Sequence, residues 1–234
     1  MIKLQKPFAR GAEHQVCLKE NQTLQTCDKV YKFPDNIWCN TSFEAQIANL
    51  QMLEDLGIKC CNTNVLNPGL VYIESEMKQV PYLIEQEFVT DPTLNEIDLQ
   101  NESIRMQLLE YLIKSDELYV NKGMAIDFLG AESMKCLIKF FFDRSLPLGV
   151  YNFKKNNEND IYLLDTGILK LDSLNPFVAK IINTMIQLQH YLIFKVINYY
   201  EKTNDFFPKI NFATKTFAFP AYLATRVVTP FKNY

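Results

Sequence analysis

The chain has 234 residues, of which 48% are hydrophobic and 13% aromatic, enough to build a sizeable core as one two-lobed unit or two small domains. Its net charge is −3 and no basic run is visible, so we expect no nucleic-acid partner. The longest uncharged apolar run is far shorter than the ~20 residues of a membrane span, and the N-terminus has no apolar signal core, which together predict a cytoplasmic protein.

The cysteines and histidines disfavour two kinds of site. The 6 cysteines include no Cys-x2-Cys pair, which disfavours a zinc site, and reduced thiols suit a reducing compartment. The two histidines, His14 and His190, stand beside no evident nucleophile, which disfavours acyl transfer.

The N-terminal third begins with a turn entering a strand at Arg10–Leu18, and Gly11 lies in that turn. A second strand is predicted at Lys29–Pro34, because the residues there alternate in character and place Lys32 on one face.

A helix is predicted next, capped by Thr41 or Ser42 and ended by Gly57. Glu44 lies in its first turn, where a carboxylate also stabilises the helix dipole. Apolar residues recur at helical spacing along it: Phe43, Ile47, Leu50, Leu53 (or Met52) and Leu56.

Two further strands, Gly69–Ser75 and Tyr82–Val89, precede a break at Asp91-Pro92 and a largely helical stretch. Within that stretch, the strand-like run Gly123–Gly130 contains Asp127 just before a turn. Asp127 could also cap the predicted helix that follows, Ala131–Phe142.

Asn152 and Asp165 stand at the two ends of a predicted hairpin, with a polar turn and an apolar strand between them. Both side chains offer oxygen ligands, and a tight hairpin can bring them to one hard cation. Asp165-Thr166-Gly167 alone would also make a good turn. It also resembles the catalytic strand of an aspartic protease, but the neighbouring segments are predicted to be helical rather than all strand.

Taken in order, these features resemble a compact, atypical protein-kinase-like fold similar to the aminoglycoside phosphotransferases, over roughly residues 8–170. The interval from Asn152 to Asp165 is thirteen residues and that from Val16 to Lys32 is sixteen, both close to the kinase intervals. The resemblance implies an α+β, two-lobed fold. Residues 1–90 would form an N-lobe with a small antiparallel sheet and one helix. Residues 91–234 would form a reduced, mainly helical C-lobe containing the metal-binding hairpin 152–167.

The resemblance also implies ATP and Mg²⁺ as cofactors. Asn152 and Asp165 would hold the metal, and Lys32 would hold phosphate. Glu44 would orient Lys32, with Glu54 as the rival.

Two further nucleotide contacts are implied by position. Gly11 is the remaining glycine of a degenerate Gly-rich loop, with Ala9 and His14 at the other two glycine positions. Glu87 lies in the strand that resembles the hinge, where backbone groups meet the adenine.

The catalytic base is where the chain departs from the family. Kinases place an Asp about five residues before the metal-binding Asn, but Pro147 occupies that position here. Asp127 is therefore the candidate for a displaced base, ahead of Asp143.

Two other functions stay open. The missing acid at Pro147 favours a pseudokinase, which would use the same fold as a binding or regulatory module. The chain could instead be an unrelated α+β interaction protein in which the matches are accidental. The phosphoryl acceptor, a small molecule or a protein, is not identified by these motifs, and transfer of a nucleotidyl group is a further possibility.

Overall fold

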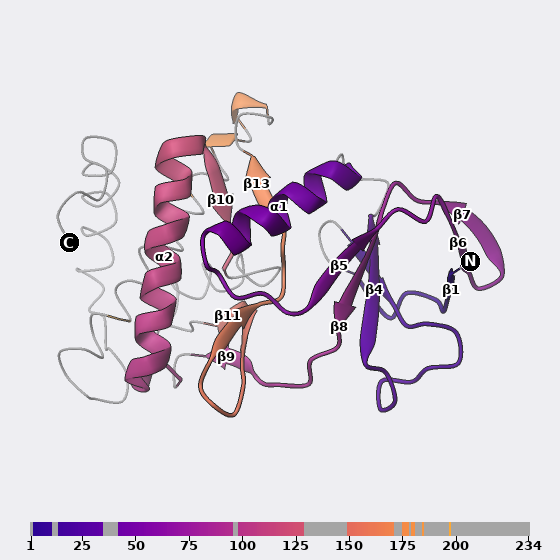
Figure 1. The fold of residues 1–234 in the computed structure, drawn as a ribbon, viewed down its shortest axis with the longest axis horizontal. Coiled ribbons are helices and arrows are strands. Elements are labelled where there is room, and N and C mark those ends of the chain that lie inside the picture. Colours follow the sequence, from indigo (N-terminus) through magenta and orange to yellow (C-terminus); the bar gives the residue numbers. More distant parts are fainter. Residues whose placement is uncertain are drawn as a thin grey trace. The chain divides into compact units, whose positions relative to one another are not determined.

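The computed structural model describes residues 2–10, 14–34, 42–95, 98–128 and 149–170, together with 175–177, 179, 180, 184 and 197 (Figure 1). The chain divides into two compact units, residues 1–91 with 162–166, and residues 92–161 with 167–234. The described part contains two long α-helices and several small, mostly antiparallel sheets, which confirms the α+β class. The sequence predicted a boundary between the lobes after residue 90, but it did not predict that residues 162–166 return to the first unit. That the two units are kinase lobes stays a prediction.

The first unit is built on a five-stranded antiparallel sheet with strand order β2-β3-β4-β8-β5. Its strands are β2 (Ala9–Arg10), β3 (His14–Cys17), β4 (Lys29–Pro34), β5 (Thr63–Leu66) and β8 (Leu83–Glu87). Strand β4 has the bounds that the sequence predicts, and its side chains alternate between the two faces of the sheet.

A second sheet of the first unit covers one face of the first. It consists of β1 (Ile2–Leu4), β6 (Leu70–Ile73) and β7 (Glu76–Gln79) in the order β1-β6-β7. Residues from both sheets form one apolar cluster: Leu4, Cys17, Tyr31, Phe33, Val71, Ile73, Val80 and Leu83. The strand predicted at Gly69–Ser75 is thus one arm of a hairpin whose second arm, β7, was not predicted.

Helix α1 (Phe43–Asp55) begins and ends as its sequence predicts. The Ser42 hydroxyl accepts a hydrogen bond from the Ala45 N–H at 3.2 Å, and Gly57 follows the helix with a φ of +65°. The apolar stripe predicted along it is only partly buried, however. Ile47 is 45% exposed, whereas the buried side chains are Gln46, Asn49 and Leu53. The helix therefore turns two amides toward the protein interior.

The second unit contains helix α2 (Glu102–Lys122) and a short 3₁₀ helix, η1 (Asp98–Gln100). Its strands are β9 (Thr93–Asn95), β10 (Met124–Ile126), β11 (Gly149–Lys155) and β13 (Ile168–Lys170), and β12 (Ile161–Leu163) leads the chain back into the first unit. Strand β10 pairs with β13 and β11 pairs with β9, both antiparallel.

An aromatic cluster fixes β11 within the second unit. The Phe153 ring stacks on Tyr111 of α2, with ring centroids 5.9 Å apart, and meets Phe128 edge-on at 5.1 Å. The hairpin turn begins at Asn156, whose Oδ1 accepts hydrogen bonds from the Glu158 and Asp160 N–H groups. The polar turn predicted between Asn152 and Asp165 therefore begins only after Lys155, where β11 ends.

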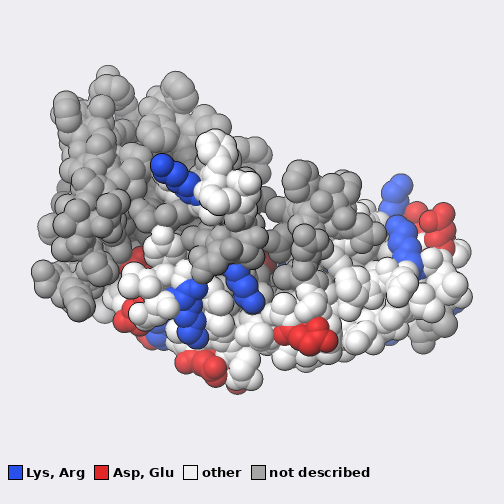
Figure 2. Space-filling model, turned by 90° about the horizontal axis from the view of Figure 1, so that it is seen from above, with Lys and Arg blue, Asp and Glu red and all other residues white. Residues whose placement is uncertain are grey.

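The described surface shows no charge segregation on the face drawn in Figure 2, where Lys and Arg side chains lie among Asp and Glu side chains. Among the described helices, none combines the length and the apolar character needed to cross a membrane.

Candidate functional site

The face of the five-stranded sheet that points away from the apolar cluster carries Lys32. Val16 of β3 and Ile84 of β8 lie opposite Lys32 of β4. His14 lies two residues before Val16, and Tyr82 two residues before Ile84. Because side chains alternate along a strand, His14, Lys32 and Tyr82 share this face.

Lys32 contacts a segment that returns from far along the chain. Its Nζ donates a hydrogen bond to the Leu164 carbonyl at 3.4 Å, and Gln86 Nε2 donates to the same oxygen at 2.8 Å. The backbone holds the segment as well, because the Cys61 N–H donates to the Leu163 carbonyl at 3.0 Å. These contacts bring Asp165, the next residue, to the neighbourhood of Lys32.

The electrostatics of Lys32 reflect these surroundings. Burial lowers the pKa of the Lys32 ammonium, and the negative charge of Asp165 acts in the opposite direction. Asp165 itself is exposed. The structure thus combines a partly desolvated cation with an accessible carboxylate, two of the residues that the sequence singled out.

The sequence predictions missed His14 as a member of this site. The ring Nε2 lies 2.9 Å from the Tyr82 hydroxyl, which also accepts a hydrogen bond from Gln46 Nε2 of α1 at 3.3 Å. Burial lowers the pKa of His14 to about 4; Asp165 acts against this shift and Lys32 adds to it. His14 is therefore neutral at pH 7. The available signal was its spacing from Val16, which places it on the face of Lys32.

Glu44 does not orient Lys32, because the expected ion pair is not formed between these two described residues. Glu44 is exposed at the start of α1, where hydrogen bonds from its own backbone N–H and from the Ser42 hydroxyl lower its pKa. The physical reason is the orientation of the helix, which turns Gln46 rather than Glu44 toward the sheet.

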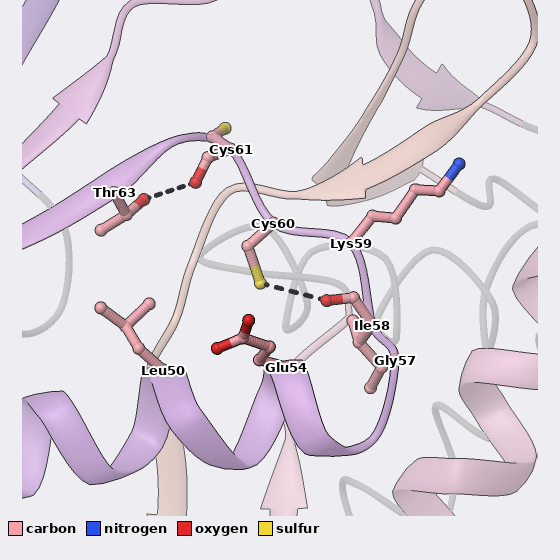
Figure 3. A pocket seen from close by; sticks show the side chains of 8 residues that line it. All are labelled: Leu50, Glu54, Gly57, Ile58, Lys59, Cys60, Cys61 and Thr63. Atoms are coloured by element: carbon pink, nitrogen blue, oxygen red, sulfur yellow. Dashed lines mark hydrogen bonds between the residues drawn. The ribbon is translucent and has the colours of Figure 1, made fainter.

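The rival residue, Glu54, lies at a separate pocket of about 390 Å³ at the end of α1. Figure 3 shows its side chain pointing toward the Cys60 thiol. That thiol donates a hydrogen bond to the Ile58 carbonyl at 3.6 Å, and burial raises the pKa of Cys60 to about 12. The thiol is therefore protonated at neutral pH and a poor nucleophile.

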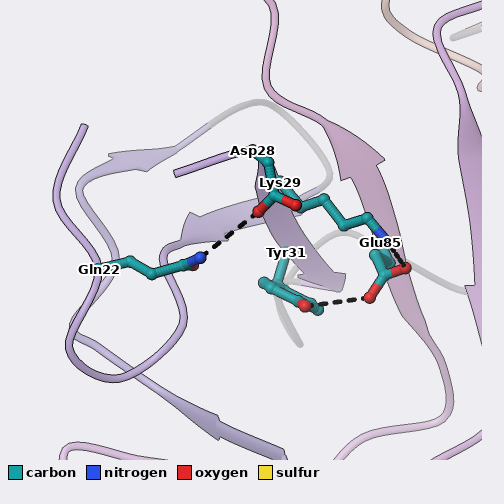
Figure 4. Close-up of polar contacts among 5 residues, drawn as sticks. All are labelled: Gln22, Asp28, Lys29, Tyr31 and Glu85. Atoms are coloured by element: carbon teal, nitrogen blue, oxygen red, sulfur yellow. Dashed lines mark hydrogen bonds and ion pairs between the residues drawn. The ribbon is translucent and has the colours of Figure 1, made fainter. Parts of the chain in front are cut away.

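The opposite face of β4 provides a direct contrast, shown in Figure 4. Lys29 Nζ donates to Glu85 Oε1 of β8 at 2.7 Å, and the Tyr31 hydroxyl donates to Glu85 Oε2 at 3.0 Å. The bond from Lys29 is the main reason that the pKa of Glu85 is lowered, and it raises the pKa of Lys29. This face pairs its lysine with a carboxylate of the neighbouring strand.

The remaining nucleotide contacts expected from the sequence lie elsewhere. Gly11 falls outside the described residues. Glu87 is the last residue of β8, its side chain is exposed, and its N–H donates to the Asn62 carbonyl at 2.9 Å. The structure thus shows no side-chain role for Glu87 within the described part of the first unit.

In the second unit, the structure brings Asp127 and Asn152 together. Asn152 Nδ2 donates to the Asp127 carbonyl at 2.7 Å, and the Asn152 N–H donates to the Phe128 carbonyl at 3.3 Å. Because the amide nitrogen is committed to a carbonyl, Oδ1 of Asn152 is directed away from that carbonyl. Both residues are half-buried.

Asp127 is positioned by the strand that precedes it. The Ile126 N–H donates to the Ser115 hydroxyl of α2 at 3.4 Å, and Ile126 pairs with Ile168 of β13. Asp127 directly follows Ile126, and Gly167 directly precedes Ile168. Asp143, Pro147 and the predicted helix 131–142 lie outside the described residues.

Asn152 and Asp165 belong to different units, so their convergence on one ion stays a prediction. Within the described ranges, no group of three or more His, Cys, Asp and Glu side chains is arranged to hold a metal ion. No protein-family model matches the chain, and no curated protein sequence is significantly similar to it.

Proposed function

We propose that the chain binds Mg-ATP and acts as a compact, kinase-like phosphotransferase, with residues 1–91 as the N-lobe and the second unit as the C-lobe. The observation that carries the proposal is the position of Lys32. Its ammonium is held at the Leu164 carbonyl, partly desolvated, beside the exposed carboxylate of Asp165. A cation with a perturbed pKa and an accessible carboxylate are typical of sites that bind phosphate with a metal ion.

The donor set fits Mg²⁺, which takes oxygen ligands from one or two protein groups and fills the remainder with phosphate and water. Asp165 offers an exposed carboxylate, and Asn152 offers an amide oxygen whose orientation is set by the bond from Nδ2 to Asp127. When bound, the ion would neutralise charge on the transferring phosphate. Lys32 would bind the same phosphates as a point charge.

Asp127 is the proposed base. Its backbone carbonyl anchors Asn152, so the residue that accepts a proton and the residue that holds the metal are fixed to one another. A base must come within about 3 Å of the acceptor hydroxyl, directly or through one water. Asp127→Asn should therefore abolish turnover and leave Mg-ATP binding nearly unchanged. The acceptor is a small molecule or a protein.

Thermal unfolding tests the binding proposal. Ligand that binds only the folded state stabilises it by about 2.7 kcal/mol at a hundredfold excess over Kd. We expect ATP with Mg²⁺ to raise the Tm, and EDTA or Asp165→Asn to remove the increase. An unchanged Tm at millimolar Mg-ATP would contradict nucleotide binding, and an increase that survives EDTA would contradict the metal assignment.

A pseudokinase is the second candidate, favoured by the missing ion pair between Lys32 and Glu44. It predicts Mg-ATP binding without transfer. Incubation with ATP labelled at the γ-phosphate separates the two candidates, since only the enzyme releases or transfers label, and only when Asp127 is intact. Absence of both binding and transfer would leave an unrelated α+β interaction protein as the remaining candidate.

A further inference from the structure

His14 lies in the row of side chains next to Lys32. Val16 is opposite Lys32, and His14 is two residues from Val16 on the same face. Such diagonal neighbours on a sheet have Cα atoms about 7–8 Å apart, close enough for both side chains to reach one ligand. Asp165 and Lys32 both influence the charge state of His14, as expected for groups around one site.

A buried chain of hydrogen bonds fixes the orientation of the imidazole. Gln46, Tyr82 and His14 are 1%, 0% and 9% exposed. The Gln46 amide donates to the Tyr82 hydroxyl, and that hydroxyl can donate its own proton to His14 Nε2. In the tautomer that accepts this proton, the neutral imidazole carries its own proton on Nδ1. In the described part of the chain, Nδ1 has no hydrogen-bond partner.

We propose that His14 is a further ligand-contacting residue of this site, and that its Nδ1–H donates a hydrogen bond to an oxygen of the phosphates that Lys32 binds. The proposal rests on the proposed function. An ammonium and an imidazole N–H are both donors, and a phosphate chain offers them several anionic acceptor oxygens, whereas a nucleoside offers only neutral acceptors. Gln46 and Tyr82 serve to orient the ring.

The test compares the affinities of Mg-ATP and adenosine for the whole chain and three variants. A hydrogen bond to a charged group is worth about a tenfold to hundredfold change in affinity. We expect His14→Leu to weaken Mg-ATP binding by at least about tenfold and to leave adenosine binding unchanged. His14→Gln, whose amide can still donate, should recover part of the loss. Lys29→Met, on the opposite face of β4, is the control and should bind like the wild type.

Each outcome decides the proposal. Mg-ATP binding by His14→Leu within about twofold of the wild type would overturn it, and so would an equal loss of adenosine binding, which indicates general damage to the site. If His14→Leu does not fold, Tyr82→Phe takes its place, because it keeps the imidazole and removes the hydroxyl that orients it. A loss of at least about threefold then supports the proposal, and an unchanged affinity overturns it. Absence of Mg-ATP binding by the wild type would instead refute the proposed function.

Discussion

The two faces of the five-stranded sheet differ in which side chains they bury and in what their lysines contact. One face packs Tyr31, Phe33 and Leu83 against the second sheet, and its lysine, Lys29, pairs with Glu85. The other face places His14, Lys32 and Tyr82 beside α1 and the segment 162–166, and its lysine contacts a backbone carbonyl.

The two faces therefore differ in what their side chains contribute to the free energy of folding. Burying an apolar side chain stabilises the fold directly, whereas partly burying a lysine and a histidine costs free energy that nearby hydrogen bonds only partly offset. Polar groups kept at such a cost are typical of functional sites. The comparison therefore supports the proposal that the first face stabilises the fold and the second binds ligand.

The largest expected effect is on the apolar face. Leu83 is 0% exposed within the apolar cluster, so Leu83→Ala should lower the free energy of unfolding by about 2–5 kcal/mol, from lost burial and the cavity left behind. Urea denaturation measures the loss. The folded fraction should keep its affinity for Mg-ATP; a loss of both together would show that the two faces are not separable in this way.

The pH dependence of stability probes the polar face. The folded-state pKa of His14, about 4, lies below the ordinary value of 6.5, so only the unfolded chain takes up this proton as pH falls through that window. His14 should therefore cost the fold about 2 kcal/mol between pH 7 and pH 5. Denaturation of the wild type and His14→Gln at both pH values isolates the effect. An identical pH dependence in the two proteins would show that His14 is not buried in its neutral form.

Smaller effects are expected at the start of α1, away from both faces. Ser42→Ala removes the N-cap hydrogen bond to Ala45 and should lower the free energy of unfolding by about 1 kcal/mol.

Glu44→Gln should change the free energy of unfolding little and leave Mg-ATP affinity unchanged, because Glu44 is exposed and does not contact Lys32. Urea denaturation and a binding titration check both variants. A marked loss of Mg-ATP affinity in Glu44→Gln would contradict this prediction and support the ion pair with Lys32 that was expected from the sequence.

The sequence predicted the parts of the fold that depend on local rules. The bounds of β4 follow from alternation, the ends of α1 from Ser42 and Gly57, and the strand before Asp127 from an apolar run that meets a turn. Each of these signals lies within a few residues of the structure it specifies.

The parts that were missed depend on distant pairing. The carbonyl that Lys32 contacts lies 132 residues further along the chain. The buried face of α1 was predicted from apolar spacing, but Gln46 and Asn49 occupy it, and Gln46 bonds the Tyr82 hydroxyl on the sheet. Hydrophobic spacing places Leu53 correctly on the buried face but cannot predict that two amides share this face with it.

The central claim is that the polar face of the sheet binds Mg-nucleotide through Lys32. Calorimetric titration of Mg-ATP into the wild type, Lys32→Met and Lys29→Met tests it most directly, because the two lysines lie on the same strand and point to opposite faces. The account predicts saturable, Mg²⁺-dependent binding to the wild type and to Lys29→Met, and a loss of at least about tenfold in affinity for Lys32→Met. Equal binding by Lys32→Met and the wild type, or no binding by any of the three, would contradict it.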